Sequence, residues 1–498
     1  MITELLYCSE VWVAILVVII LFYAFKIRKR SSLEPPGPWG VPVLGYMPFL
    51  GRKMNLTINR LANKYGDVFQ LRIGTRKVVV ISGQKAIREA LLNSGTTFAG
   101  RPDFYSYMVS ENFGFADFSP SVRLYKKQAL KAFGQFTRVR RRELHQVAHN
   151  AVLMLMKEFQ AARNQPFDPK SALYKVTCTI MGYICHGKFF DANDKEVSTI
   201  LSKSDDFVKY VAFGIICDFL PWAKFLVRKQ LQSFEDLLKD IMNYSDKLAE
   251  AHVGSYDGET MRNISDMFRK VAEEMDEDEK KELNINETML KQQISGLFGA
   301  GFGTVSGTLR YGILIMALHP EIQKRVQNEI DHVIGKDHYP EFEDESNLPY
   351  TAATVAEIYR HHSMSALGIT HSTTCDTNFA GYFIPKNTPV IFNLYSANRD
   401  GTIFADPEKF NPERFLTEDG RCNTAITQHV VPYGLGHRRC AGEPVARLEV
   451  FLFFATILQQ CIIKESPNHP LDVDDYIMAF GIIHKPFKVI FLSRNGKW

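Results

Sequence analysis

The chain has 498 residues, of which 46% are hydrophobic and 23% charged, a composition typical of a folded protein with a large core. Lysine and arginine number 59 against 55 aspartate and glutamate residues, and the formal charge of +4 gives no reason to expect a nucleic-acid partner. No repeat and no Gly/Ser-rich linker follows the first fifty residues, so we expect one large folded unit after them.

The eight cysteines are scattered and form no Cys-x-x-Cys pair, which argues against structural zinc and against a disulfide-bonded secreted domain. We expect a reduced body that faces the cytosol, in which most of these thiols are small buried hydrophobic groups. They are Cys8, Cys178, Cys185, Cys217, Cys375, Cys422, Cys440 and Cys461.

Residues 1–30 are predicted to form a membrane anchor. Leu5–Phe25 is apolar except for Ser9 and Glu10, and a helix needs about 20 such residues to cross a bilayer. A cleaved signal peptide carries its positive charge before the apolar run, whereas here the cations within 26–30 follow it and mark the cytosolic side. We therefore expect a single-pass protein of the endoplasmic reticulum membrane with a cytosolic body.

Residues 31–50 are predicted to be a linker, because Pro35, Pro36 and Pro38 fix the backbone dihedrals and remove hydrogen-bond donors. Residues 51–498 form the body.

The body is predicted to be mainly α-helical with a minor β-sheet component. Alternating and β-branched residues at 68–81 predict a β-hairpin. Apolar residues from 83 to 360 recur mainly at helical spacing, and they include a long helix over 287–318. A β-rich segment follows at 367–392, and a helix at 446–461 precedes short C-terminal strands.

The segment Tyr433–Pro444 reads YGLGHRRCAGEP and gathers residues suited to a metal site. Gly436 permits a tight turn, Arg438 supplies a fixed cation, and Gly442 lets the backbone approach closely. Cys440 lies just before a predicted helix, where unpaired amides and the helix dipole lower the pKa of a thiol. Cys440 is therefore predicted to be a metal ligand.

This segment resembles the haem-binding loop of the cytochrome P-450 family, F-x-x-G-x-R-x-C-x-G, with Tyr433 in place of the usual phenylalanine. The resemblance implies the cytochrome P-450 fold, a haem b cofactor, and Cys440 as the axial ligand that pushes electron density onto the iron. It also implies that the ring of Tyr433 shields the sulfur and that Arg438 holds a haem propionate. Gly436 and Gly442 belong to the same cofactor-binding loop.

Two further segments carry the resemblance. Glu357–Arg360 resembles the family's E-x-x-R helix, and Phe410–Phe415 resembles its arginine-bearing loop. The likeness implies a buried structural cluster of Glu357, Arg360 and Arg414 that locks the core behind the haem, although buried ion pairs are not reliable stabilisers.

Phe98–Pro102 and His371–Thr377 resemble the animal microsomal branch that holds the aryl-hydrocarbon-inducible drug oxidases and the steroid 17α-hydroxylases. That likeness implies that His371 is a second propionate contact. Judged from its own segment alone, a surface histidine in a strand fits equally well.

The family's W-x-x-x-R pattern is altered here, because Val122 and Lys126 stand at its tryptophan and arginine positions. Lys126 either meets a propionate as a point charge, without the bidentate geometry of arginine, or belongs to a solvated face with Lys127 and Lys131.

The long helix carries a second departure, in a segment that resembles the oxygen-binding motif A-G-x-D/E-T. Ala300 and Thr304 share one face, where the turn at Gly301 opens a groove for dioxygen and the threonine hydroxyl donates a hydrogen bond. Gly303 replaces the acid, so the protons must come from water or Ser306. The alternative for Thr304 is a hydroxyl bonded to its own helix backbone.

The resemblance implies NADPH-cytochrome P-450 reductase as partner, with cytochrome b5 a further candidate, together with membrane lipid and a lipophilic substrate such as a steroid, an aromatic xenobiotic or a fatty acid. A basic run near the expected haem face suits an acidic reductase. Aromatic residues in the expected pocket roof suit an apolar substrate, or form plain core. The basic residues are Lys126, Lys127, Lys131, Arg138, Arg140, Arg141 and Arg142, and the aromatic residues are Phe104, Tyr105, Tyr107, Phe113, Phe115 and Phe118.

We therefore expect a haem-thiolate monooxygenase that uses NADPH through a reductase. One alternative is a reductase-independent isomerase or dehydratase that rearranges a peroxide, which Gly303 favours and Thr304 disfavours. The other is a non-catalytic haem-binding sensor.

Overall fold

The computed structural model describes residues 31–494 except 111, 188–197, 200–201, 204–215, 254–255, 257 and 479–480, together with four residues of the first thirty, at positions 13, 14, 17 and 18. The predicted anchor thus lies almost wholly outside the described residues. Within the described part, no helix combines the length and the apolar character needed to span a membrane.

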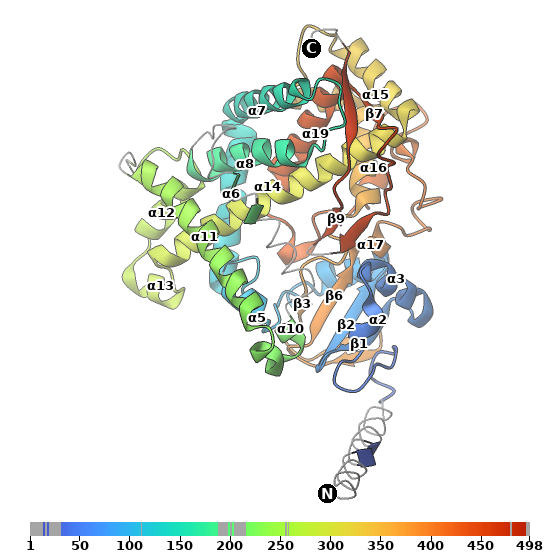
Figure 1. The fold of residues 1–498 in the computed structure, drawn as a ribbon. Coiled ribbons are helices and arrows are strands. Elements are labelled where there is room, and N and C mark those ends of the chain that lie inside the picture. Colours follow the sequence, from blue (N-terminus) through green and yellow to red (C-terminus); the bar gives the residue numbers. More distant parts are fainter. Residues whose placement is uncertain are drawn as a thin grey trace, which may run out of the picture.

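Most of the described chain is helical, as predicted, and the helices surround α14 (Glu287–Leu318), which crosses the middle of the molecule (Figure 1). Asn286 caps α14 by accepting a hydrogen bond from the backbone of Met289, and Pro320 begins the next helix. The longer helices around it are α3 (Met54–Tyr65), α6 (Pro120–Gly134), α7 (Arg141–Ala161), α8 (Lys170–His186), α11 (Arg228–Val253), α12 (Ile264–Glu273), α15 (Pro320–Val333), α16 (Pro349–His362) and α19 (Glu443–Gln460).

Short helices occupy several of the connections between these long ones. They are α2 (Met47–Leu50), α4 (Gln84–Arg88), α5 (Tyr105–Ser110), α10 (Ile216–Phe219), α13 (Glu277–Glu282), α17 (Leu394–Ala397) and α18 (Thr424–Thr427), with a 3₁₀ turn at Pro221–Phe225.

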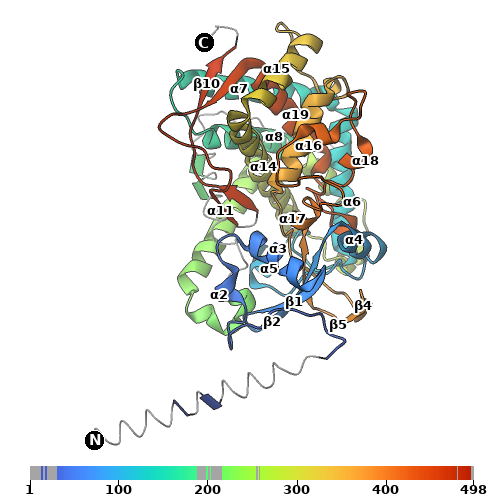
Figure 2. The ribbon, with the colours of Figure 1, turned by 90° about the vertical axis from the view of Figure 1, so that its right-hand side faces the viewer.

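The predicted hairpin is confirmed as antiparallel strands β1 (Val68–Ile73) and β2 (Arg76–Ser82). The sheet grows by β6 (Pro389–Asn393), which runs parallel to β2, and by β3 (His371–Ser372) at its edge. This sheet lies at the lower end of the molecule in Figures 1 and 2, away from most of the helices. The remaining pairs are β4 (Thr377–Phe379) with β5 (Tyr382–Ile384), β7 (Cys461–Glu465) with β10 (Val489–Ser493), and β8 (Tyr476–Met478) with β9 (Ile482–His484).

Close packing against α8 fixes one side of α14. A β-carbon on Gly301 would lie 2.4 Å from the sulfur of Met181, so a larger residue there would displace the methionine side chain. The hydroxyl of Thr177 also donates to the carbonyl of Phe302 at 3.0 Å. Because Phe302 and Thr304 are two residues apart on a helix, this contact turns Thr304 away from α8.

The predicted structural cluster joins α16 to the loop that follows residue 405. Arg360 donates to both carboxylate oxygens of Glu357, at 2.6 and 2.7 Å, and all of this lies in the fully buried core. Arg414 donates to the same carboxylate at 3.3 Å, as does the backbone of Asn411 at 2.7 Å. One carboxylate therefore neutralises two buried guanidinium groups.

Replacing this carboxylate should destabilise the fold strongly. Glu357→Ala leaves two buried arginines unpaired, and we expect the free energy of unfolding to fall by about 3–5 kcal/mol. Glu413→Ala, which removes a half-exposed partner of Arg325 in the same region, should cost less than about 1 kcal/mol. Denaturant titration measures both, and equal losses would contradict the central role of Glu357.

Candidate haem-thiolate site

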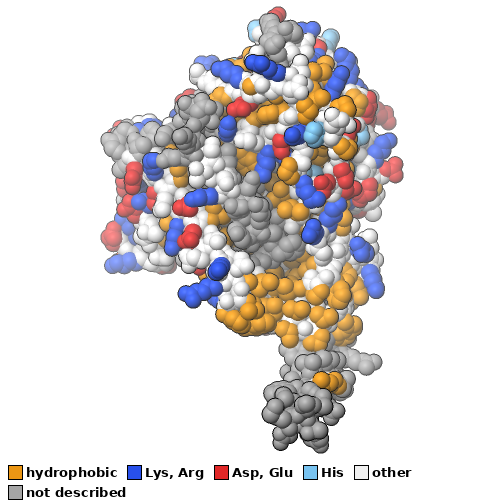
Figure 3. Space-filling model, in the orientation of Figure 1, with side chains coloured by type: hydrophobic (Ala, Val, Ile, Leu, Met, Phe, Trp, Pro, Cys, Tyr) orange, Lys and Arg blue, Asp and Glu red, His pale blue; other side chains and the backbone are white. Residues whose placement is uncertain are grey.

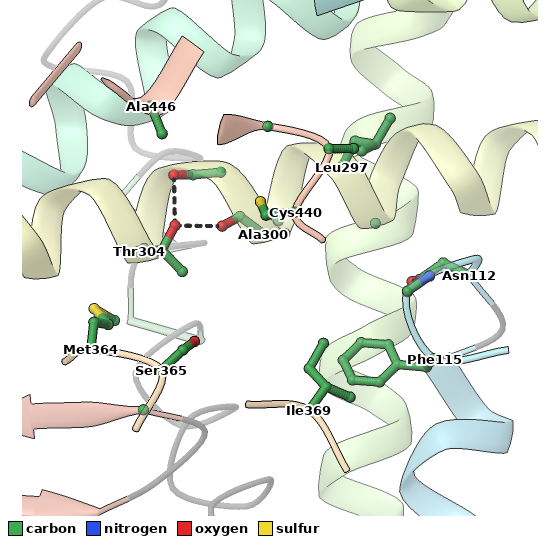
Figure 4. Close-up of a pocket in the computed structure, with 18 of the residues that line it drawn as sticks. Asn112, Phe115, Leu297, Ala300, Thr304, Met364, Ser365, Ile369, Cys440 and Ala446 are labelled. Atoms are coloured by element: carbon green, nitrogen blue, oxygen red, sulfur yellow. Dashed lines mark hydrogen bonds between the residues drawn. The ribbon is translucent and has the colours of Figure 1, made fainter. Parts of the chain in front are cut away.

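A cavity of about 890 Å³ lies beside α14, and its wall gathers residues that are far apart in the sequence (Figure 4). Its lining comes mainly from α6, α14, the loop before α19, and residues 364–371 leading into β3. The predicted site residues on this wall are Lys126, Ala300, Gly301, Thr304, His371, Tyr433, Arg438, Cys440 and Gly442.

The loop that carries Cys440 can be built only with glycine at 436. Gly436 has φ of +66°, and a β-carbon there would lie 2.0 Å from the carbonyl oxygen of Leu91. The chain then makes a short 3₁₀ turn, and the backbone amide of Cys440 donates to the carbonyl of Tyr433 at 2.9 Å. These contacts hold the thiol three residues before the start of α19.

Protein encloses the Cys440 thiol on most sides, while its exposed surface faces the cavity (Figure 4). Burial raises the pKa of this thiol, and the backbone amides of Gly442 and Glu443 only reduce that rise. The predicted lowering is therefore wrong in its net direction, because desolvation outweighs the helix N-terminus. A β-carbon on Gly442 would come to 3.9 Å from the sulfur, an ordinary contact.

The ring of Tyr433 lines the cavity near Cys440 and makes a contact that phenylalanine would lack. Its hydroxyl donates to the hydroxyl of Tyr359 on α16 at 2.8 Å. The guanidinium of Arg447 lies 5.1 Å from the centre of the Tyr433 ring and 5.9 Å from that of Tyr359. The tyrosine thus ties the loop to the helix of the structural cluster.

Cationic side chains gather on another part of the cavity wall. Arg438 donates to the carbonyls of Ala99, Phe113 and Ala116 at 2.7 to 2.9 Å. Nζ of Lys126 donates to the carbonyl of His437. These bonds fix both cations on the wall of the cavity.

His371 and Arg101 lie on the same wall, and both are buried. Nδ1 of His371 is 2.6 Å from the carbonyl of Phe98, and burial together with the charge of Arg101 holds the pKa of the imidazole well below its usual range. Arg101 donates to the carbonyls of Gly114, Ile369 and Thr370 at 3.0 to 3.2 Å. His371 is therefore a buried strand residue that faces the cavity.

The cations on this wall exceed the negative charge that surrounds them. Burial lowers the pKa of Arg101 to about 10, and burial with repulsion from Arg101 lowers that of Arg438 to about 9. The pKa of Lys126 falls to about 8 for the same two reasons, with Arg438 as the main repelling charge. Asp117 is the carboxylate that opposes the shifts of both arginines. Three cations and one carboxylate suit a ligand that brings two carboxylates, as haem b does.

Ala300 and Thr304 are among the α14 residues on the wall, and they lie four residues apart on one face (Figure 4). The Thr304 hydroxyl is open to the cavity and donates to the carbonyls of Ala300 at 3.0 Å and Gly301 at 3.4 Å. The structure therefore contains the bond of the Thr304 hydroxyl to its own helix backbone, which was the alternative prediction for this residue. The hydroxyl of Ser306 is buried and donates to the Gly303 carbonyl at 3.0 Å.

A cysteine thiol at a large internal cavity, a threonine on the facing helix and a cationic wall together define the site of a haem-thiolate protein. The chain belongs to the cytochrome P450 family, whose model matches residues 35–491. It is 33% identical to cytochrome P450 1A1 of Rattus norvegicus over 493 residues, which cover 96% of this chain and 94% of that protein. It is 35% identical to cytochrome P450 1A1 of Canis lupus familiaris over 471 residues, covering 92% and 89%.

The chain is therefore a cytochrome P450 monooxygenase with haem b as its cofactor. The cavity residues fit haem b, because the Cys440 thiol and the cationic side chains line one cavity that is large enough to hold it. When bound, the haem supplies the chemistry that activates dioxygen.

Two cavity residues were missed by the sequence analysis. Arg101 belongs to the Phe98–Pro102 segment, which was matched to the family without a role for its arginine. Glu449 lies on α19 and gives no sequence signal, because an acid in a helix is usually solvated.

The substitution at position 126 makes a prediction about cofactor retention. Lys126→Arg restores a bidentate cation to a wall that lacks one there, so haem should dissociate several-fold more slowly, within about one order of magnitude. Haem transfer to apomyoglobin measures the rate. Lys127→Arg, at the exposed neighbouring position, is the matched control and should leave it unchanged.

Proposed function

We propose that this monooxygenase inserts one atom of O2 into a lipophilic substrate, with electrons that NADPH supplies through NADPH-cytochrome P450 reductase. The observation that carries the proposal is the presence of Cys440 and Thr304 on the wall of one cavity. Much of the remaining wall is apolar and includes Phe113, Phe115 and Ile369. A steroid, an aromatic xenobiotic or a fatty acid suits such a lining in size and polarity.

In this proposal each predicted residue has one task. Cys440 is the axial ligand, and the ring of Tyr433 covers the sulfur. Arg438 and Lys126 face the propionates, with the missed Arg101 as a further cation. The remaining assignments rest on position alone. His371 is a second propionate contact, and Gly436 and Gly442 shape the cysteine loop. Ala300 and Gly301 shape the part of the cavity that would hold dioxygen, and Thr304 donates protons to it.

The reductase is proposed to dock where α6 borders the cysteine loop. Lys126 on α6 contacts the carbonyl of His437, and its neighbours Lys127 and Lys131 are exposed. The basic residues Arg140 and Arg141 contribute less, since they pair with Glu143 and Glu343. An acidic partner would be attracted by these exposed lysines. Cytochrome b5 is a second acidic candidate for this face.

A location in the endoplasmic reticulum membrane, with residues 1–30 as the single-pass anchor, is supported by an apolar surface next to the first residues of the body (Figure 3). The turn at Gly74 contacts both Leu44 and Phe219, which brings two exposed hydrophobic segments together. Burying such a surface in lipid headgroups is favourable. Its exposed members are Leu33, Trp39, Val43, Leu44, Phe49, Ile216, Trp222, Phe225 and Leu226.

The missing acid at Gly303 favours one second candidate, an isomerase or dehydratase that rearranges an organic peroxide without a reductase. Such a reaction needs no protons from outside. The exposure of the Thr304 hydroxyl to the cavity weighs against it, and against a non-catalytic haem sensor.

Coupling of electron use to product formation tests the proposed function. The purified chain with a microsomal reductase and a lipophilic aromatic probe should form nearly one molecule of hydroxylated probe for each NADPH oxidised. Cys440→Ser removes the ligand and should abolish product, whereas Cys422→Ser, at an exposed thiol, should not change it. Rapid rearrangement of an organic hydroperoxide, with the electrons of NADPH ending in hydrogen peroxide made from O2, would instead identify the isomerase.

Membrane extraction tests the anchor. The full chain should remain in microsomal membranes after alkaline carbonate washing, because about 20 apolar residues in a bilayer are not released by high pH. A chain lacking residues 1–30 should be released, since the remaining apolar surface binds only at the interface. Release of the full chain would contradict the single-pass proposal.

A further inference from the structure

The cavity continues along α14 beyond Thr304, as far as Arg310. Here the segment after α16 lies beside β9, since the amide of Ile482 donates to the carbonyl of Met364 at 2.8 Å. The same segment packs on α14, because a β-carbon on Gly307 would lie 3.0 Å from the sulfur of Met364. We call this part of the cavity the polar arm. The polar residues that line it are Thr308, Arg310, His362 and His484.

His362, the last residue of α16, is a buried imidazole on the wall of the polar arm. It is 3% exposed, and its ring stacks on that of Tyr311 with 4.5 Å between the ring centres. Neither ring nitrogen reaches a partner in hydrogen-bonding geometry among the described residues. Burial, with repulsion from His484, holds the pKa of the imidazole well below its usual range, although the backbone of Ile482 opposes this shift. His362 is therefore neutral at pH 7 and offers one N–H donor and one nitrogen acceptor.

The neighbours of His362 are bonded elsewhere. The Tyr311 hydroxyl lies 2.5 Å from Nδ1 of His361, and Arg310 donates to the carbonyls of His484 and Lys485 at 2.6 and 2.8 Å. A buried polar group without a partner destabilises a fold, and native proteins contain few of them. Phenylalanine at 362 would keep the stacking without this cost, so the imidazole suits a ligand that pairs with it.

His484 adds a second imidazole to the polar arm. Its ring centre lies 5.2 Å from that of His362, and its Nε2 lies 3.0 Å from the carbonyl of Val473. A ring nitrogen that faces a carbonyl carries the proton, and burial lowers the pKa of His484 to about 4. Nδ1 of His484 is therefore a hydrogen-bond acceptor.

The polar arm lies at a distance from the oxygen side of the cavity. Tyr311, which stacks on His362, follows Thr304 by seven residues, or about 10 Å along the helix at 1.5 Å per residue. The wall between them is apolar at Gly307 and Met364, and Figure 4 shows Met364 across the cavity from the threonine side of α14. An elongated apolar molecule can reach both places at once.

We propose that the polar arm binds a hydroxyl group at one end of an elongated apolar substrate, with His362 as the residue that selects this group. The inference rests on the proposed function and deepens it, because it names the polar group of the lipophilic substrate. It also sets the orientation, in which the hydroxylated end lies away from the carbon that reacts.

A hydroxyl suits the two imidazoles better than other oxygen groups do. It can donate to one nitrogen and accept from the other, whichever ring nitrogen of His362 carries the proton. A carbonyl oxygen can only accept. A carboxylate would lose its hydration beside two neutral rings, while the nearby Arg310 is already bonded to two carbonyls.

Binding of two matched probes tests the selection. 4-Hydroxybiphenyl and 4-methylbiphenyl differ little in size, and their dissociation constants are measured on the haem-loaded full chain by calorimetry and by the shift of the haem absorption band. The ratio of the methyl to the hydroxyl constant should be about five- to tenfold higher in the parent chain than in His362→Phe. Both probes are compared within each variant, so a loss of folded protein leaves the ratio unchanged.

Two further variants complete the comparison. His362→Gln should keep most of the parent's ratio, because an amide still donates and accepts hydrogen bonds. His332→Phe, at an exposed histidine on α15, is the matched control and should keep all of it. Equal ratios in the parent chain and His362→Phe would overturn the proposal. If biphenyl-4-carboxylate bound most tightly and lost this advantage in His362→Phe, the hydroxyl would be the wrong ligand group.

The position of oxidation tests the orientation. With NADPH and reductase, the parent chain should hydroxylate 4-hydroxybiphenyl on its unsubstituted ring, and His362→Phe should attack both rings. Attack on the phenol ring by the parent chain would contradict the placement of the hydroxyl in the polar arm. Absence of any NADPH-dependent product, with the binding ratio as expected, would overturn the proposed function and leave the hydroxyl site standing.

Discussion

The central constraint on this molecule is that the Cys440 thiol must face a large internal cavity while the surrounding chain encloses that cavity. Cys440 meets this constraint because Gly436 turns where no other residue fits against Leu91, and because the loop enters α19 directly. The facing wall is formed by α14, which α8 contacts through the hydrogen bond from Thr177 to the carbonyl of Phe302. Thiol and threonine come from segments 136 residues apart in sequence, and only these packing contacts bring them to one space.

Charge is arranged around the cavity in two unlike ways. Behind it, two arginines are neutralised by the carboxylate of Glu357 and serve the fold. On the cavity wall, burial lowers the pKa values of Arg101, Arg438 and Lys126, and repulsion between the cations adds to this for Arg438 and Lys126. The charges of the first arrangement are neutralised without a cofactor. The positive charges of the second would be neutralised by a cofactor that carries two carboxylates. The difference separates structural from functional arginines without reference to sequence motifs.

The sequence predicted the elements that carry local signals. The hairpin at 68–81, the helix at 287–318 and the glycine turn at 436 each follow from spacing or from a backbone need, and all three are present. Contacts set by tertiary packing were not predictable. Burial reversed the expected pKa shift of Cys440. The cavity position of Glu449 was not predicted, because a buried glutamate in a helix has the same sequence pattern as an exposed one.

The departures at 122, 126, 303 and 433 alter the surroundings of the site and leave its geometry intact, since the residues at all four positions line the cavity. The central claim is therefore that the chain still splits dioxygen and places one atom in its substrate. Reaction under ¹⁸O2 with NADPH and reductase tests this most directly by mass spectrometry of the product. The account predicts one ¹⁸O atom in each hydroxylated molecule. Product oxygen that comes from water or from an added hydroperoxide would contradict it.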